Sequence, residues 1–204
     1  MDEKTLLKLY DADDYPAWVA CAKLIRRELV EAYPFREGRV FEDNEAVCHW
    51  ICEGKKLAQM DCQLYFYRTN DGSTTKSNFS IKKLDYLWAL ESIIRYYEFI
   101  GFDLMRRRFF ERYAEAVISS CNGLRYILGQ DDLTKAVEKR FRKLAREQGL
   151  KPTQSQLEAL LDAVHPRLAK LYWPLSGAVR TLRDQGVSGI IQKITKHMRK
   201  GERQ

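Results

Sequence analysis

The stretch SIKKLDYLWALESIIRYYEFIGFDLMRRRFFERYAEAVISSCNGLRYIL, residues 80–128, decides the fold. Apolar residues recur at helical spacing on both sides of Gly101, and glycine is the expected break between two helices. The sequence therefore predicts one long helix from Ser80 to Ile100 and a second from about Asp103 to Leu128. The side chains predicted to face inward on the first helix are Leu84, Leu87, Trp88 and Ile94.

The residues before this pair predict shorter elements. Residues 2–10 and 23–32 show helical spacing, with Pro16 and Pro34 as breaks. Residues 44–53 predict a helix that ends at Gly54 and has one apolar face. That face consists of Ala46, Val47, Trp50 and Ile51. Residues 57–61 and 64–68 are short and apolar or aromatic, which predicts two short strands joined by a tight turn, and a polar loop follows over 69–78.

The tail of the chain differs in charge and in pattern. From Asp131 onward it contains sixteen Lys and Arg against eight Asp and Glu, a net charge of +8, whereas the whole chain carries +7. Helices are predicted over 131–148, 153–173 and 176–199, with an N-cap signal beginning at Thr153. We predict two parts, residues 1–129 and a basic helical extension over residues 130–204.

Composition narrows the class of protein. With 45% apolar and 31% charged residues in 204, the chain has the balance of a globular protein with a real core. It has no apolar run of membrane-spanning length, and its start, Met-Asp-Glu-Lys, lacks the features of a signal peptide. Five cysteines, an odd number, favour reduced thiols. We expect a cytoplasmic protein.

Residues 70–74, Asn-Asp-Gly-Ser-Thr, have the letters of a nucleotide-sugar site. Such a site needs a continuous apolar strand before it and a helix start after it. Here Arg68 and Thr69 precede it, and Thr-Lys-Ser-Asn follows. Asp11-Ala12-Asp13-Asp14, the other stretch with metal-motif letters, lies upstream in a polar segment. Residues 70–74 are therefore predicted to be a loop and not the donor strand.

A family resemblance is carried by four stretches taken in order. They are Lys-Leu-Ile-Arg-Arg-Glu-Leu at 23–29, Phe35 to Asp43 with its Gly38 and Glu-Asp pair, Leu-Tyr-Phe-Tyr-Arg at 64–68, and Gly72-Ser73. In order and spacing this resembles the second half of bacterial family-2 glycosyltransferases, over about residues 15–125. The resemblance implies an α+β, predominantly helical chain. It would be the C-terminal part of a GT-A-like fold, with two short strands, a long helical pair and a helical tail.

The resemblance also implies an activity. The chain would be the acceptor-side portion of an inverting glycosyltransferase acting on a cell-surface polysaccharide or lipid-linked acceptor. Asp43, next to Glu42, would be the base that takes the acceptor hydroxyl's proton. Arg68 would contact the donor diphosphate, with Gly72, Ser73 and Thr74 supplying backbone and hydroxyl donors.

The family's donor-binding first half is absent from this sequence. The nucleotide-sugar donor and its divalent cation, Mg or Mn, would therefore be held mostly by groups outside this chain, on a separate donor-binding half. No metal site is predicted within the sequence itself. Cys48, His49 and Cys52 lack a fourth ligand and a paired spacing, and buried thiols are the favoured interpretation.

Three alternatives stay open. The loop that carries Arg68 and residues 72–74 is equally well explained as a plain solvent-exposed turn. Asp43 is also a good helix N-cap residue, a role that needs no chemistry. In the tail, Val187, Ile190, Ile191 and Ile194 lie among basic residues. Such a helix either packs on its neighbours or lies peripherally on an anionic membrane surface. A non-catalytic helical module that binds a membrane or a protein partner through this tail is the second functional hypothesis. No motif favours nucleic acid.

Overall fold

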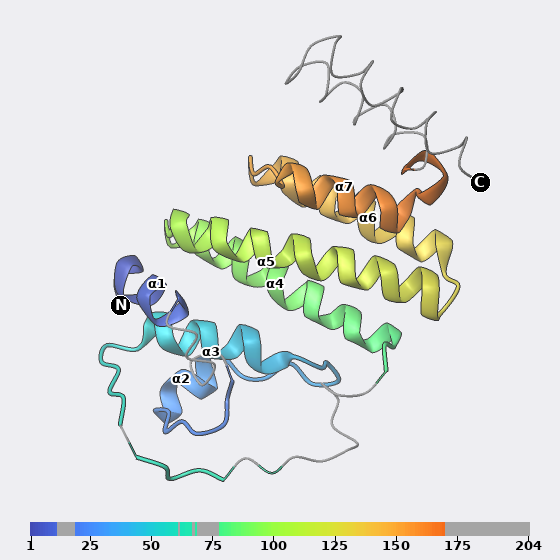
Figure 1. Ribbon diagram of the computed structural model, residues 1–204. Coiled ribbons are helices and arrows are strands. Elements are labelled where there is room, and N and C mark those ends of the chain that lie inside the picture. Colours follow the sequence, from blue (N-terminus) through green and yellow to red (C-terminus); the bar gives the residue numbers. More distant parts are fainter. Residues whose placement is uncertain (12–18, 61, 67, 69–77, 170–204) are drawn as a thin grey trace, which may run out of the picture.

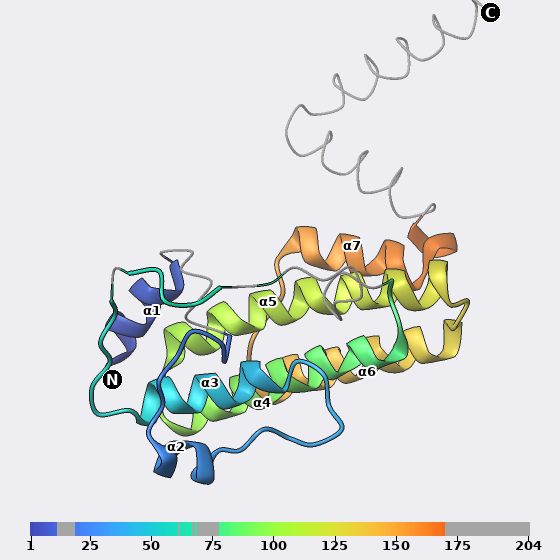
Figure 2. The same cartoon turned by 90° about the horizontal axis from the view of Figure 1, so that it is seen from below.

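Two long antiparallel helices form the centre of the protein. The computed structural model describes residues 1–11, 19–60, 62–66, 68 and 78–169. The central helices are α4 (Asp85–Phe99) and α5 (Asp103–Asn122). The others are α1 (Glu3–Asp11), α2 (Arg27–Ala32), α3 (Glu42–Glu53), α6 (Asp131–Glu147) and α7 (Gln154–Val164). Helices α1 to α3 lie on one side of the central pair and α6 and α7 on the other (Figure 1). Figure 2 shows α7 running beside α5.

The corner between α4 and α5 is built on Gly101, which has φ +74°. A residue with a Cβ rarely adopts this left-handed conformation. It lets the Phe102 N–H donate to the Tyr97 carbonyl at 2.8 Å, which satisfies a carbonyl at the end of α4. The predicted helical pair is therefore confirmed. The first arm begins with a 3-10 turn over Ile81–Leu84.

The second arm ends in a π-helical turn, Gly123–Ile127. A Cβ at Gly123 would lie about 2.5 Å from the Phe79 ring. The glycine therefore lets the segment before α4 pack directly against the backbone at the end of α5.

One apolar cluster joins the central pair to the helices on both of its sides. It contains Leu6 of α1, Val47 of α3 and Ile94 of α4, together with Phe109 of α5 and Phe141 of α6. The apolar face predicted for residues 44–53 is confirmed, since Ala46, Val47, Trp50 and Ile51 are all buried. The boundary predicted near Gly129 coincides with a turn, where φ is +64°. The division into two parts stays a prediction. Among the residues described, no helix is both long and apolar enough to cross a membrane.

The predicted strands are absent from the described residues of segments 57–61 and 64–68, so the α+β, GT-A-like fold class is wrong for this structure, which is helical. The described residues of these segments lie outside any helix or strand, and Met60, Leu64 and Phe66 are 66, 79 and 88% exposed. The physical reason is that a strand needs a neighbour. Two short strands by themselves are marginal in water, and no further sheet accompanies them in the described chain.

The helices predicted for the tail have different outcomes. The helix over 131–148 is confirmed by α6. The N-cap at Thr153 is confirmed as a capping box, in which its hydroxyl accepts from Gln156 N–H at 3.2 Å and the Gln156 side chain accepts in return. The helix predicted over 153–173 is interrupted: α7 ends at Val164, His165 breaks it before Pro166, residues 166–169 are helical again, and residues 170–173 lie outside the described residues. The third predicted helix, 176–199, lies outside the described residues.

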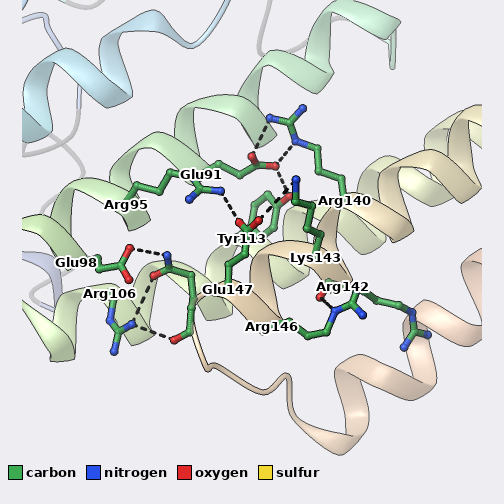
Figure 3. Close-up of polar contacts among 11 residues, drawn as sticks. Glu91, Arg95, Glu98, Arg106, Tyr113, Arg140, Arg142, Lys143, Arg146 and Glu147 are labelled. Carbon is green, nitrogen blue, oxygen red and sulfur yellow. Dashed lines mark hydrogen bonds and ion pairs between the residues drawn. The ribbon is translucent and has the colours of Figure 1, made fainter.

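A buried carboxylate joins α4, α5 and α6 (Figure 3). The Glu91 side chain is 8% exposed. It accepts from the Tyr113 hydroxyl at 2.5 Å and from two Arg140 nitrogens at 2.6 and 2.8 Å. Burial, followed by the Glu91 charge, raises the pKa of the Tyr113 hydroxyl well above its usual range, so this hydroxyl stays a donor. The Arg140 side chain itself is 60% exposed, so the two ends of the pair differ in their access to water.

This asymmetry predicts unequal losses of stability. Arg140→Met leaves the Glu91 carboxylate buried without its cation and should cost about 3 kcal/mol in the free energy of unfolding. Glu91→Gln returns an exposed guanidinium to water and should cost about 1 kcal/mol. Arg95→Met, which removes the exposed pair with Glu147, is the control and should cost less than about 1 kcal/mol. Urea unfolding of the three variants measures this, and equal losses for Arg140→Met and Arg95→Met would contradict it.

Candidate functional site

The start of α3 is shaped by an unusual backbone conformation at Phe41. Its φ of 62° and ψ of 24° place a bulky residue in the left-handed region. Such a residue costs about 1–3 kcal/mol and persists only where its surroundings hold it. Here the Phe41 ring packs against Tyr86 of α4 at 5.1 Å between ring centroids. The turn delivers Glu42 and Asp43 directly into the first turn of the helix.

Asp43 is the second residue of α3 and not its N-cap. The N-cap is Phe41, and no side chain caps the helix. The alternative that Asp43 serves as the N-cap is therefore wrong. Its Oδ1 accepts from Asn44 Nδ2 at 2.9 Å, and the side chain is half-buried. Together with Glu42 and Glu45 it lies in the first turn, where the helix macrodipole stabilises negative charge.

Glu45 has a structural role that Asp43 does not share. It is buried, and it accepts from the Ser92 hydroxyl of α4 and from Arg36 Nε at 3.2 Å. This carboxylate therefore fastens α3 to α4. Glu45 and Asp43 therefore differ in their surroundings: Glu45 is buried and paired with a cation, whereas the residue paired with Asp43 is a neutral amide.

The loop before α3 is fixed to the first residue of α4. Arg39 forms an ion pair with Asp85 at 2.5 Å, and the Val40 N–H donates to the same carboxylate at 3.2 Å. The guanidinium carbons of Arg36 and Arg39 lie 4.7 and 5.4 Å from the centroid of the Trp88 ring. Trp88, predicted to face inward, is instead partly buried beneath two cations.

The sequence did not single out Arg36 or Arg39 as site residues, and it placed Trp88 in the core. The visible signal in the sequence is a pair of arginines three residues apart, just before an acidic helix start. Trp88, which both arginines contact, lies about fifty residues further along the chain. The two ion pairs, Arg36 with Glu45 and Arg39 with Asp85, form a partly exposed charged surface beside the Asp43 turn.

The donor-side residues are not brought to this turn by any contact that the described residues show. Arg68 is exposed and lies outside any helix, and Gly72, Ser73 and Thr74 lie outside the described residues. No hydrogen bond or ion pair in the described chain joins Arg68 to Asp43. Asp43 begins α3, whereas the segment that leads to Arg68 leaves the other end of that helix at Gly54. Their roles stay predictions.

Cys48 and His49 belong to an aromatic cluster. The Cys48 thiol donates to the Tyr97 hydroxyl at 3.2 Å and is fully buried. The His49 ring stacks on Tyr33 at 4.4 Å and tilts against Tyr96 at 4.0 Å. Burial lowers the pKa of this imidazole. No group of three or more His, Cys, Asp or Glu side chains in the described part of the chain could hold a metal ion.

The cysteine thiols on α3 and α5 differ in pKa. Burial raises the pKa of the Cys48 thiol well above its usual range and that of Cys121 to about 12. A hydrogen bond with Cys48 lowers the pKa of Cys52, which is only partly buried. One turn of helix thus separates a thiol whose pKa is raised from a thiol whose pKa is lowered.

The chain matches no protein-family model, no curated protein and no solved structure in comparisons with each.

The thiol order predicts selective alkylation. At pH 8 in the folded protein, iodoacetamide should modify Cys52 and the exposed Cys62 at least about 100-fold faster than Cys48 or Cys121, because the thiolate is the reactive form. Peptide mass mapping over time measures the rates, and the urea-unfolded protein is the control in which the difference should disappear. Comparable rates for Cys48 and Cys52 in the folded state would contradict the assigned environments.

Proposed function

We propose that this chain is the acceptor-side portion of an inverting glycosyltransferase, with Asp43 as the general base. One observation carries the proposal: Asp43 is a half-buried carboxylate, placed by a strained turn at a helix start, that does not cap its helix. Backbone strain of this kind clusters at functional sites. The order of motifs in the sequence adds the reaction class.

The chemistry assigned to Asp43 is a single proton transfer. The acceptor hydroxyl gives its proton to the carboxylate while its oxygen forms a bond to the anomeric carbon. The bond from that carbon to the donor phosphate breaks, and the nucleoside diphosphate leaves with the electron pair. Asn44 holds Oδ1, so Oδ2 is the oxygen that takes the proton. Glu42, one residue earlier, supplies a second carboxylate that can accept from another acceptor hydroxyl.

Donor binding is assigned to groups that are mostly outside this chain. Arg68, with Gly72, Ser73 and Thr74, would contact the diphosphate, and a separate donor-binding half would supply the rest. The described residues do not offer a ligand set for the divalent cation expected with the donor.

The base assignment predicts a loss of rate with little loss of stability. In the enzyme reconstituted with a donor-binding half, Asp43→Asn should lower kcat by about 10²–10⁴-fold. The free energy of unfolding should fall by less than about 1 kcal/mol, because Asp43 makes no cap hydrogen bond and the substitution removes only the favourable interaction of its charge with the helix macrodipole.

The control is Asp132→Asn, which changes an exposed aspartate in the first turn of α6. It should leave kcat unchanged and lower the free energy of unfolding by a similarly small amount. Sugar transfer to the acceptor and thermal unfolding are measured for each variant. Normal turnover in Asp43→Asn would end the catalytic assignment.

A second function, membrane-surface binding through the tail, is supported by charge. Residues 170–204 contain eight Lys and Arg against two Asp and Glu. Polybasic segments bind anionic lipid surfaces, and salt screens the attraction. On this hypothesis the full chain should co-sediment with phosphatidylserine-containing vesicles at low salt and much less at high salt. Phosphatidylcholine vesicles are the control. Binding that does not change with salt, or no binding, would contradict membrane-surface binding through the tail.

A further inference from the structure

Arg112 of α5 is a half-buried arginine without a carboxylate partner in the described part of the chain. Its Nε donates to the Tyr86 hydroxyl of α4 at 2.5 Å, and its Nη1 donates to the Tyr10 hydroxyl of α1 at 3.5 Å. Arg106 and Arg125 are also partly buried, and each of them forms an ion pair with an aspartate. Arg112 differs from them in having a positive charge that no described side chain neutralises.

The Nη2 nitrogen of Arg112 has no acceptor among the described residues. It is not one of the buried polar atoms that lack a partner, so it is accessible to solvent, and it carries two N–H groups. A guanidinium that is partly removed from water is destabilised, because neutral hydroxyl groups replace its lost solvation only in part. An anion bound at Nη2 would therefore be favoured, and Arg112 could donate to it while it keeps both tyrosine hydroxyls.

The guanidinium of Arg112 lies close to the strained turn at the start of α3. The Tyr86 ring connects the two, because its centroid is 5.8 Å from the Arg112 guanidinium carbon and 5.1 Å from the centroid of the Phe41 ring. This turn carries the proposed base. Arg108, one helical turn before Arg112, has its guanidinium carbon 5.5 Å from the centroid of the Tyr10 ring. Arg108 is already paired with two carboxylates, so Arg112 supplies the uncompensated charge.

The class of ligand follows from the guanidinium, whose planar N–H groups match the oxygens of phosphate and carboxylate groups. Of these two groups, phosphate is the one that the proposed reaction brings to the Asp43 turn. It is present in the donor diphosphate and, where the acceptor is linked to a lipid, in the phosphate of that linkage. We propose that Arg112, with Tyr10 and Tyr86, binds a phosphate group of one of these two substrates. The site rests on the proposed function for the source of the phosphate, whereas its own test is binding.

Isothermal titration calorimetry of the full chain in phosphate-free buffer tests the site, with inorganic pyrophosphate as the probe. We expect one pyrophosphate to bind per chain. Arg112→Gln should weaken binding at least about tenfold, because a hydrogen bond to a charged group is lost. Arg112→Lys keeps the positive charge and should bind more tightly than Arg112→Gln. Arg107→Gln, at an exposed arginine of the same helix, is the matched control and should bind normally.

Two larger probes identify the source of the phosphate. Uridine diphosphate represents the donor, and farnesyl phosphate represents a lipid-linked acceptor. The probe that binds more tightly than pyrophosphate, and loses this affinity in Arg112→Gln, identifies the substrate that the site binds. Asp43→Asn should bind all three probes at least as tightly as the unchanged chain, because it removes a negative charge. Failure of the catalytic proposal would therefore leave phosphate binding intact, and the two proposals can fail separately.

Three results would overturn the proposal. The first is that none of the three probes binds, and the second is binding that Arg112→Gln leaves unchanged. The third concerns stability in phosphate-free buffer. If Arg112→Gln lowered the melting temperature as much as Arg106→Gln, which breaks an ion pair with Asp103, the charge of Arg112 would already be neutralised within the chain. We expect a smaller loss for Arg112→Gln, and a rise in melting temperature on adding pyrophosphate that the unchanged chain shows and this variant lacks.

Discussion

The buried Glu91 carboxylate is the constraint on which the arrangement of the helices depends. A carboxylate that is 8% exposed must have partners, and its partners come from two other helices: the Tyr113 hydroxyl of α5 and the guanidinium of Arg140 on α6. Apolar packing allows helices to rotate and slide by small amounts, but three short hydrogen bonds to one side chain do not. Glu91 therefore fixes the rotation of α4 about its own axis.

The candidate site is a consequence of that fixed rotation. Asp85, Trp88 and Ser92 follow one another at helical spacing along α4, so they share one stripe of its surface. That stripe receives the loop and the helix that precede it in the chain. Asp85 holds Arg39, Trp88 lies beneath both arginines, and Ser92 donates to Glu45. If α4 were rotated, Phe41 would lose the Tyr86 ring and the strained turn would relax, taking Asp43 with it.

The parts of this structure that could be predicted from sequence are those determined by local periodicity. The helical pair around Gly101, the apolar face of α3 and the Thr153 capping box each depend on residues within a few positions of one another. The strands expected over 57–61 and 64–68 failed because strand formation depends on a partner elsewhere, which composition does not reveal. The site shows the same limit. Asp43 could be singled out, but the left-handed Phe41 that removes it from the cap, and the pairing of Arg36 with Glu45, come from tertiary packing.

Helix α3 separates two surfaces that have different requirements. Its N-terminal turn needs rigidity, since a general base must be held within hydrogen-bonding reach of one proton, and the ties from Glu45, Arg39 and Asp85 supply it. Its C-terminal half borders an open, mainly apolar cavity of about 1310 Å³. Val47, which also lines that cavity, follows Asp43 by four residues, a rise of about 6 Å along the helix axis. The two surfaces of α3 are therefore close neighbours. Because Glu45 and the buried Val47 hold the helix against α4 and the core, this packing sets the position of the Asp43 turn.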